Sequence, residues 1–245
     1  MGIDYAGLTQ LIDIVPSLSQ KTSLLMLGRQ KMHISRQHLK DAADARLDQL
    51  SPGLSIDKLT DSTDYAEPFF QALGVSEVTS LDYSDYEGAD IVHDLNEPIP
   101  ETLHGQYDIV LDGGTLEHVF DVKTAMNNAH DLVAPGGTFI GISPGNNFFA
   151  HGFYQFSPDV VFSFWKRGKG CAISNCTFLP EFPRDKPWEI EDPYETKRRV
   201  RMRGKQVPQR CYLFYAARKP LAETDAGGKV LQGDYTHRWK EVETE

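Results

Sequence analysis

The stretch that decides the fold is Gln106–Phe120, which reads QYDIVLDGGTLEHVF. The apolar run Ile109–Leu111 predicts a buried strand, and the turn Asp112–Gly114 ends it. Thr115–Phe120 then opens a helix. In open α/β sheets, ligands bind outside the carboxyl ends of the parallel strands, where backbone amides and short acidic side chains converge. This stretch therefore predicts a ligand crevice at the carboxyl edge of a parallel sheet.

The composition narrows the class of protein. The chain has 245 residues and a 40% hydrophobic content, which is enough for a packed core. A net charge of −10 argues against a general nucleic-acid binder. No run approaches the length of a membrane span, no signal pattern opens the chain, and Ala6 stands where a myristoylation signal needs Ser or Thr. We expect a cytoplasmic protein without a membrane span.

The three cysteines are Cys171, Cys176 and Cys211. Their odd number and unpaired spacing indicate reduced thiols rather than a metal site or a disulfide framework.

Apolar runs and helical periodicities alternate along the chain. The pattern predicts amphipathic helices near both ends of the alternating region, for example from Tyr5 to Val15, where Pro16 stops the helix. Strands that alternate with helices predict a parallel sheet covered on both faces, and the last two strands are expected to form an antiparallel end. The expected strands are Leu24–Leu27, Val78–Leu81, Ala89–His93, Ile109–Leu111, Thr138–Ser143, Ala172–Phe178 and Arg210–Ala216.

The chain shows no linker, so we expect one domain over residues 1–219, followed by a weakly ordered polar tail over residues 220–245. A long insertion rich in proline and charge occupies residues 179–209. Within it, Arg199, Arg201 and Arg203 alternate and would share one side of an extended chain. These arginines could hold a phosphate or carboxylate of a substrate. Alternatively they are solvated, or paired with Glu189, Glu191 and Asp192.

Three carboxylates, Asp82, Asp94 and Asp112, each end an expected strand of the same sheet. A single aspartate at such a place is a common turn residue. Three of them on one edge form a polar rim that suits a ligand with hydroxyl, amine and ammonium groups. The alternative for each is turn stabilisation or helix capping.

Over Ser23–Phe156 the chain resembles class I S-adenosylmethionine-dependent methyltransferases. The segments that carry the resemblance are YDIVLDGGTLEHV and LVAPGGTFIGISP. The resemblance implies a Rossmann-like α/β fold with a mainly parallel seven-stranded sheet and helices on both faces, and S-adenosyl-L-methionine as the cofactor. The positions it implies for cofactor binding are Gly28 and Arg29 after the first strand, Asp82 and Tyr83 at the ribose, Asp94 and Leu95 at the adenine, and Asp112 and Gly113 at the methionine end.

The loop after the first strand departs from the family pattern. It reads MLGRQKMHI, with a single glycine followed by Arg29, Gln30 and Lys31. Arg29 and Lys31 could pair with the cofactor carboxylate. A methyltransferase-like fold that has lost its cofactor stays open as the competing interpretation.

Methyl transfer to an alcohol needs an aligned, desolvated acceptor and gains from a general base, for which histidine is suited. His118 and His151 both follow strand ends at the ligand edge. His151 is the favoured base because it lies in an aromatic loop, and Tyr154 and Glu117 are secondary candidates. The alternative is a structural histidine bonded to backbone. No metal site is expected from the spacing of acidic residues and histidines.

The aromatic loop contains Phe148, Phe149, Phe153, Tyr154 and Phe156, which either stack on an acceptor or pack the loop onto the sheet. The segment AHGFYQFSP resembles bacterial methyltransferase-like proteins associated with sugar or cell-surface polysaccharide genes. We therefore expect an O-methyltransferase for a small-molecule or saccharide hydroxyl, with an anionic acceptor and a homodimer both open. The alternative is a non-catalytic binding module. A nicotinamide-dependent enzyme is disfavoured, because no Gly-x-Gly-x-x-Gly follows the first strand.

Overall fold

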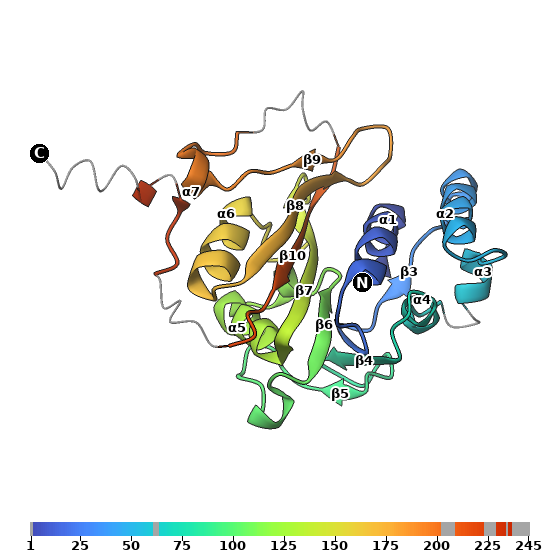
Figure 1. Ribbon diagram of the computed structural model, residues 1–245, viewed down its shortest axis with the longest axis horizontal. Helices are drawn as coiled ribbons and strands as arrows, with labels where there is room; N and C mark the ends of the chain where they lie inside the picture. Colours follow the sequence, from blue (N-terminus) through green and yellow to red (C-terminus); the bar gives the residue numbers. More distant parts are fainter. Residues whose placement is uncertain (1, 61–63, 202–208, 223–228, 234, 237–245) are drawn as a thin grey trace, which may run out of the picture.

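A computed structural model describes residues 2–60, 64–201, 209–222, 229–233 and 235–236 (Figure 1). An eight-stranded mixed sheet crosses the molecule in the order β5-β4-β2-β6-β7-β10-β8-β9. The strands β5, β4, β2, β6 and β7 are mutually parallel, whereas β10, β8 and β9 follow in antiparallel pairs. These eight strands are β2 (Ser23–Leu27), β4 (Glu77–Asp82), β5 (Ile91–Val92), β6 (Tyr107–Asp112), β7 (Val133–Asn146), β8 (Ala172–Pro180), β9 (Trp188–Glu189) and β10 (Cys211–Arg218).

The α/β prediction and its antiparallel end are confirmed, but the prediction of seven strands is wrong. The eighth strand, β9, comes from the expected insertion, where Trp188 and Glu189 pair with Phe178 and Thr177 of β8. Two residues of chain carry too short a pattern to be recognised as a strand. A separate two-stranded parallel sheet joins β1 (Gly2–Ile3) to β3 (Lys31–Met32), and it was likewise not expected.

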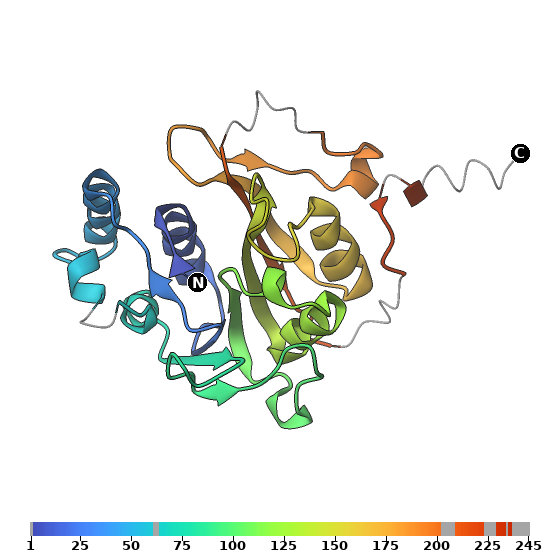
Figure 2. The same cartoon turned by 180° about the vertical axis from the view of Figure 1, so that it is seen from behind.

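Helices cover both faces of the sheet, as Figures 1 and 2 show. The alternating side chains of β2 assign the two layers: Leu24 and Met26 belong to one core cluster, and Leu25 and Leu27 to the other. The first layer contains α1 (Tyr5–Ile14), η1 (Val15–Ser17), α2 (Gln37–Leu50), α3 (Ile56–Leu59) and α4 (Glu67–Ala72). The second contains α5 (Val122–Leu132), α6 (Pro158–Val160) and the π-helical segment η4 (Val161–Gly168). Short turns complete the elements: η2 (Glu101–Leu103), η3 (Leu116–His118) and α7 (Pro193–Thr196).

None of the helices in the described ranges is long and apolar enough to cross a membrane.

The three cysteine thiols are free and buried. Burial raises the pKa of Cys171 and of Cys211 to about 11 and that of Cys176 to about 12. Because only the thiolate is reactive, a pKa near 11 lowers the reactive fraction at pH 8 by roughly 100-fold or more from that of a free thiol.

We therefore predict that Ellman's reagent at pH 8 modifies none of the three thiols on mixing with the folded protein and all three after unfolding in guanidinium chloride. One thiol that reacts within the mixing time in the folded state would contradict this prediction.

Candidate functional site

Strand register brings the three expected acids to one edge of the sheet. Leu27 of β2 lies opposite both Leu81 of β4 and Asp112 of β6. Asp82 is one residue further along β4, opposite Val92 of β5. Asp94 follows Val92 two residues later in the chain. The acids therefore lie along one edge of the sheet, with Asp94 and Asp82 after the neighbouring strands β5 and β4, and Asp112 at the end of β6, one strand beyond β2.

Asp112 is completely buried, and its carboxylate holds the turn after β6. Oδ1 accepts hydrogen bonds from the amide of Thr115 at 2.8 Å and from those of Gly114 and Leu116 at 3.3 Å. Oδ2 accepts one from Ser143 Oγ at 3.3 Å. Burial raises the pKa of Asp112 to about 6. Asp112 thus caps the turn after β6, which is the structural alternative considered for the strand-end acids. Its carboxylate influences the ligand edge by holding that turn in place.

Asp82 and Asp94 are nearer the surface. Asp82 Oδ1 accepts a hydrogen bond from the amide of Tyr83 at 2.6 Å. Asp94 Oδ1 accepts bonds from Asn96, from the amide at 2.9 Å and from Nδ2 at 2.7 Å. These bonds lower the pKa of Asp94 and keep it ionised. Tyr83 is exposed and Leu95 is buried.

The loop after β2 contains a buried residue that sequence reasoning did not select, Gln30. Its Nε2 donates to the carbonyl oxygens of Leu27 at 2.8 Å and Gly28 at 3.1 Å, and these two bonds fix which way the carboxamide faces. The other end, Oε1, lies where a Cβ on Gly113 would be only 2.7 Å away. Within the described residues Oε1 has no hydrogen-bond partner. An unsatisfied buried acceptor is costly, so this position suits a donor from a ligand.

Arg29 and Lys31 bind acids of the chain itself. Arg29 Nε lies 2.7 Å from Glu67, and its guanidinium also donates to the carbonyl oxygen of Glu87 at 2.8 Å. Lys31 Nζ lies 3.1 Å from Glu87 Oε1. The guanidinium of Arg29 also lies over the ring of Tyr65, 3.9 Å from the ring centroid. These contacts connect the loop after β2 to the loop after β4.

A second group of side chains meets beyond β6 and β7. Glu117 and His118 come from η3, and His151 comes from the aromatic loop after β7. Glu117 Oε1 lies 3.6 Å from His151 Nε2 and 3.8 Å from His118 Nε2. The two imidazole rings lie 5.1 Å apart. The structure thus brings together both expected histidines and the secondary candidate Glu117.

Glu117 is the unusual member of this group. Its side chain is 1% exposed, whereas His118 is 40% and His151 is 46% exposed. In the part of the chain that the structure describes, neither carboxylate oxygen of Glu117 has a hydrogen-bond partner. Burial, and then the nearby Asp112, raise the pKa of Glu117 to about 8, and burial lowers the pKa of His118. A buried carboxylate without partners marks a site built for a ligand or a reaction rather than for stability.

The loop that carries His151 is held on the backbone of Glu117. The carbonyl oxygen of Glu117 accepts hydrogen bonds from the amides of Phe153 at 2.8 Å and Tyr154 at 3.2 Å. Gly152 permits this approach, because a Cβ there would lie 2.9 Å from the same carbonyl oxygen. The hydroxyl of Tyr154 donates to the carbonyl oxygen of Phe120 at 2.7 Å. Tyr154 therefore anchors the loop. Gly152 of the AHGFY segment is required because a side chain there would clash with the carbonyl oxygen of Glu117.

A cavity of about 290 Å³ opens in front of this group. Glu117, His118 and His151 line it together with Phe148 and Arg210. The N-terminal residues Gly2–Asp4 contribute one wall, which the sequence did not predict. The aromatic residues of the loop divide between several positions: Phe148 lines the cavity and Phe156 lies in the core, whereas Phe149 and Phe153 are exposed.

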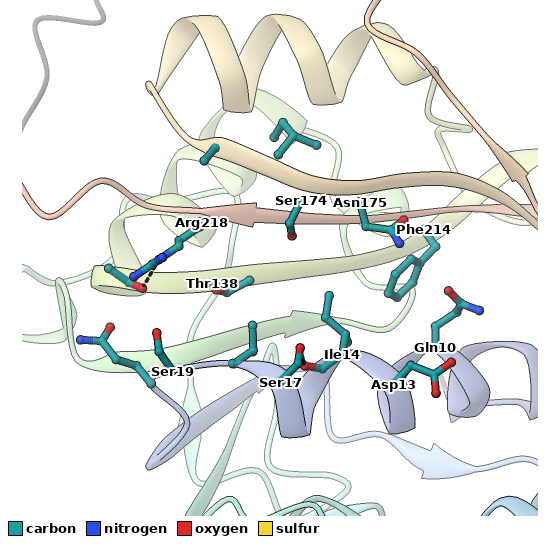
Figure 3. Close-up of a pocket in the computed structure, with 15 residues that line it drawn as sticks. Gln10, Asp13, Ile14, Ser17, Ser19, Thr138, Ser174, Asn175, Phe214 and Arg218 are labelled. Atoms are coloured by element: carbon teal, nitrogen blue, oxygen red, sulfur yellow. Dashed lines mark hydrogen bonds between the residues drawn. The ribbon is translucent and has the colours of Figure 1, made fainter.

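Two larger hollows lack such a group. One of them, of about 640 Å³, lies between α1 and the strands β7, β10 and β8. Figure 3 shows the residues that line it, among which Arg218 donates a hydrogen bond to the carbonyl oxygen of Gly136. Its carboxylate Asp13 pairs with Arg46. Another hollow, of about 530 Å³, is lined by Arg198, Arg199 and Arg201. These arginines belong to the basic run of the insertion, residues 197–205.

The acids proposed as partners of the basic run are partly used elsewhere. Asp192 binds Lys166 at 2.7 Å and Arg167 at 3.4 Å. Arg203 lies outside the residues that the structure describes.

No protein-family model matches the chain, and no curated protein matches it. Solved methyltransferase structures are similar to it. 1,6-Didemethyltoxoflavin-N1-methyltransferase of Burkholderia thailandensis, with bound 1,6-didemethyltoxoflavin and S-adenosylhomocysteine, is 14% identical over 87% of this chain and 78% of its own, with a TM-score of 0.47. A possible histamine N-methyltransferase of Thermotoga maritima is 11% identical over 89% of this chain and 90% of its own, with a TM-score of 0.48. TehB of Haemophilus influenzae is 11% identical over 86% of this chain and 62% of its own, with a TM-score of 0.48.

Proposed function

We propose that the chain is an S-adenosylmethionine-dependent methyltransferase that acts on a hydroxyl group of a small molecule or saccharide. The observation that carries this proposal is the buried carboxyl group of Glu117, whose oxygens have no hydrogen-bond partner among the described residues and which lies near two imidazoles in a cavity beside the carboxyl ends of the parallel strands. Such perturbed, converging groups in a cavity are typical of active sites.

The residues of the carboxyl edge fit the cofactor. Asp82 would accept the ribose hydroxyls, and Asp94 with the Leu95 amide would bind the adenine. The buried Oε1 of Gln30, beside Gly113, offers the acceptor that an ammonium group needs. When bound, the cofactor supplies a methyl group activated by a sulfonium.

The cavity residues would prepare the acceptor. His151 lines the cavity and would accept the proton of the acceptor hydroxyl. Oε1 of Glu117, 3.6 Å from Nε2 of His151, would help to orient the imidazole. Phe148 lines the same cavity and would exclude water from the acceptor.

Calorimetric titration with S-adenosylhomocysteine tests the cofactor site, because this product cannot react during the measurement. We expect saturable binding to the wild type, and the Asp82→Ala variant should weaken it more than tenfold, or about 1.4 kcal/mol, because the ribose hydroxyls lose their acceptor. Asp85→Ala is the matched control, since Asp85 is an exposed acid of the same loop, and its affinity should equal that of the wild type.

The second candidate function is a non-catalytic binding module on the same fold. The observation that favours it is that Arg29 and Lys31 form ion pairs with Glu67 and Glu87. These two cations were the expected partners of the cofactor carboxylate, and both are paired within the chain. The same titration separates the two functions. Folded wild type that binds no S-adenosylhomocysteine at millimolar concentration would overturn the methyltransferase and favour the module.

A further inference from the structure

Glu117, His118 and His151 have the composition and spacing of a metal ligand set. One ligand atom from each lies within 4.8 Å of the others. Around one ion with bonds of about 2.0–2.2 Å, neighbouring ligand atoms stand about 3–3.5 Å apart. The carboxylate–imidazole distances of 3.6 and 3.8 Å already approach that spacing.

The unsatisfied carboxylate is an independent indication of a ligand at this point. Both oxygens of Glu117 are buried without a hydrogen-bond partner among the described residues, and Oε1 is the one that lies near the two imidazoles. Leaving a buried carboxylate unpaired is costly, and a cation held by these atoms would remove the cost. The main chain also fixes the arrangement, because the carbonyl oxygen of Glu117 holds the loop of His151 in place.

We infer that Glu117, His118 and His151 bind one divalent ion of the first transition row. Two imidazole nitrogens and one carboxylate oxygen are a donor set that zinc and iron sites use, with coordination positions left open for a substrate or water. Here the open positions would face the cavity of about 290 Å³. The expectation of no metal site came from sequence spacing, in which His151 stands far from the Glu117–His118 pair.

The ion also bears on the substrate of the cavity, and this consequence rests on the proposed methyl transfer. An acceptor hydroxyl bound to the ion would lose its proton to solvent more readily, because a divalent cation stabilises the alkoxide. The ion would then replace His151 as the group that activates the oxygen. An acceptor with two neighbouring hydroxyls, such as a sugar or a catechol, could occupy two open positions at once.

The test is metal binding by the full-length protein after treatment with a chelator. Titration with ZnCl₂ in a calorimeter and with CoCl₂ in an absorption spectrometer should each show one ion per chain. The Glu117→Gln and His151→Ala variants should weaken both more than about tenfold. His104→Ala, which removes an exposed histidine elsewhere, should bind as the wild type does.

Several results would overturn the inference. These are an absence of binding to folded wild type, equal affinity in the ligand variants, and a preference for MgCl₂ over ZnCl₂. Because a variant could fail to fold, paramagnetically shifted proton resonances of the wild type with bound Co²⁺ provide a second measurement, and they should show two coordinated imidazoles. Titration with S-adenosylhomocysteine keeps the two proposals apart. Ion binding without cofactor binding overturns only the methyltransferase, and the reverse overturns only the ion site.

Discussion

Replacing Glu117 by methionine should stabilise the chelator-treated protein while it removes methyl transfer. The side chain is buried and its oxygens have no partner among the residues described, so an apolar chain of similar length removes a desolvation cost. A buried unsatisfied polar group costs about 1–3 kcal/mol, and we expect the free energy of unfolding to rise by about that amount. Methyl transfer should fall by roughly 10²-fold, because His151 loses the group that orients it and a misplaced catalytic group costs about that factor.

Urea unfolding and a methyl-transfer assay on the same preparation measure both effects. Glu117→Gln is the matched control: it keeps the shape and the polarity, so it should gain little stability and still lose activity. A methionine variant that is less stable than the wild type yet active would show that Glu117 is a structural residue. The assignment of the active site to this cavity would then be wrong.

Replacing Trp165 by alanine should cost about 3–5 kcal/mol of unfolding free energy, the range of large aromatic truncations in a core. Trp165 is 1% exposed and stacks on Phe139 of β7 with ring centroids 4.3 Å apart and planes inclined by 21°. It also meets Phe164 edge-on at 5.2 Å. The indole therefore packs η4 against the centre of the sheet.

The midpoint of urea unfolding should move while its slope stays the same. Trp188→Ala is the control, because Trp188 lies on the short edge strand β9 and is 41% exposed. Its loss should cost no more than about 1 kcal/mol. Equal costs for the two tryptophans would contradict the assignment of Trp165 to the core.

The strands that could be predicted are those with an uninterrupted apolar run. The run at Leu24–Leu27 became β2, and the run at Ile109–Leu111 became the centre of β6. The expected strand Ala89–His93 shortened to β5, because the side chain of Asp90 turns back to bind the amide and hydroxyl of Ser80, each at 2.8 Å. The expected strand Thr138–Ser143 corresponds to β7, which begins earlier, at Val133. Val133 already pairs with Tyr107 of β6, ahead of Pro135-Gly136-Gly137.

The candidate site could be predicted only where its parts are local in sequence. The strand-end acids follow from strand register, which the apolar runs determine, and so their common edge was predictable. The approach of His151 to Glu117 depends on Gly152 and on two amide hydrogen bonds across more than thirty positions of chain, and no periodicity encodes such a contact. Gln30 was overlooked because its role depends on the space beside Gly113.

Glu117 connects the cavity to the aromatic loop, because its side chain and its main chain make contacts on different sides. Its carboxylate meets the imidazoles in the cavity, while its carbonyl oxygen holds the amides of Phe153 and Tyr154. Whatever fixes the carboxylate also fixes the peptide that anchors the loop. The exposed ring of Phe153 would then become more rigid when the cavity is occupied, without touching the occupant.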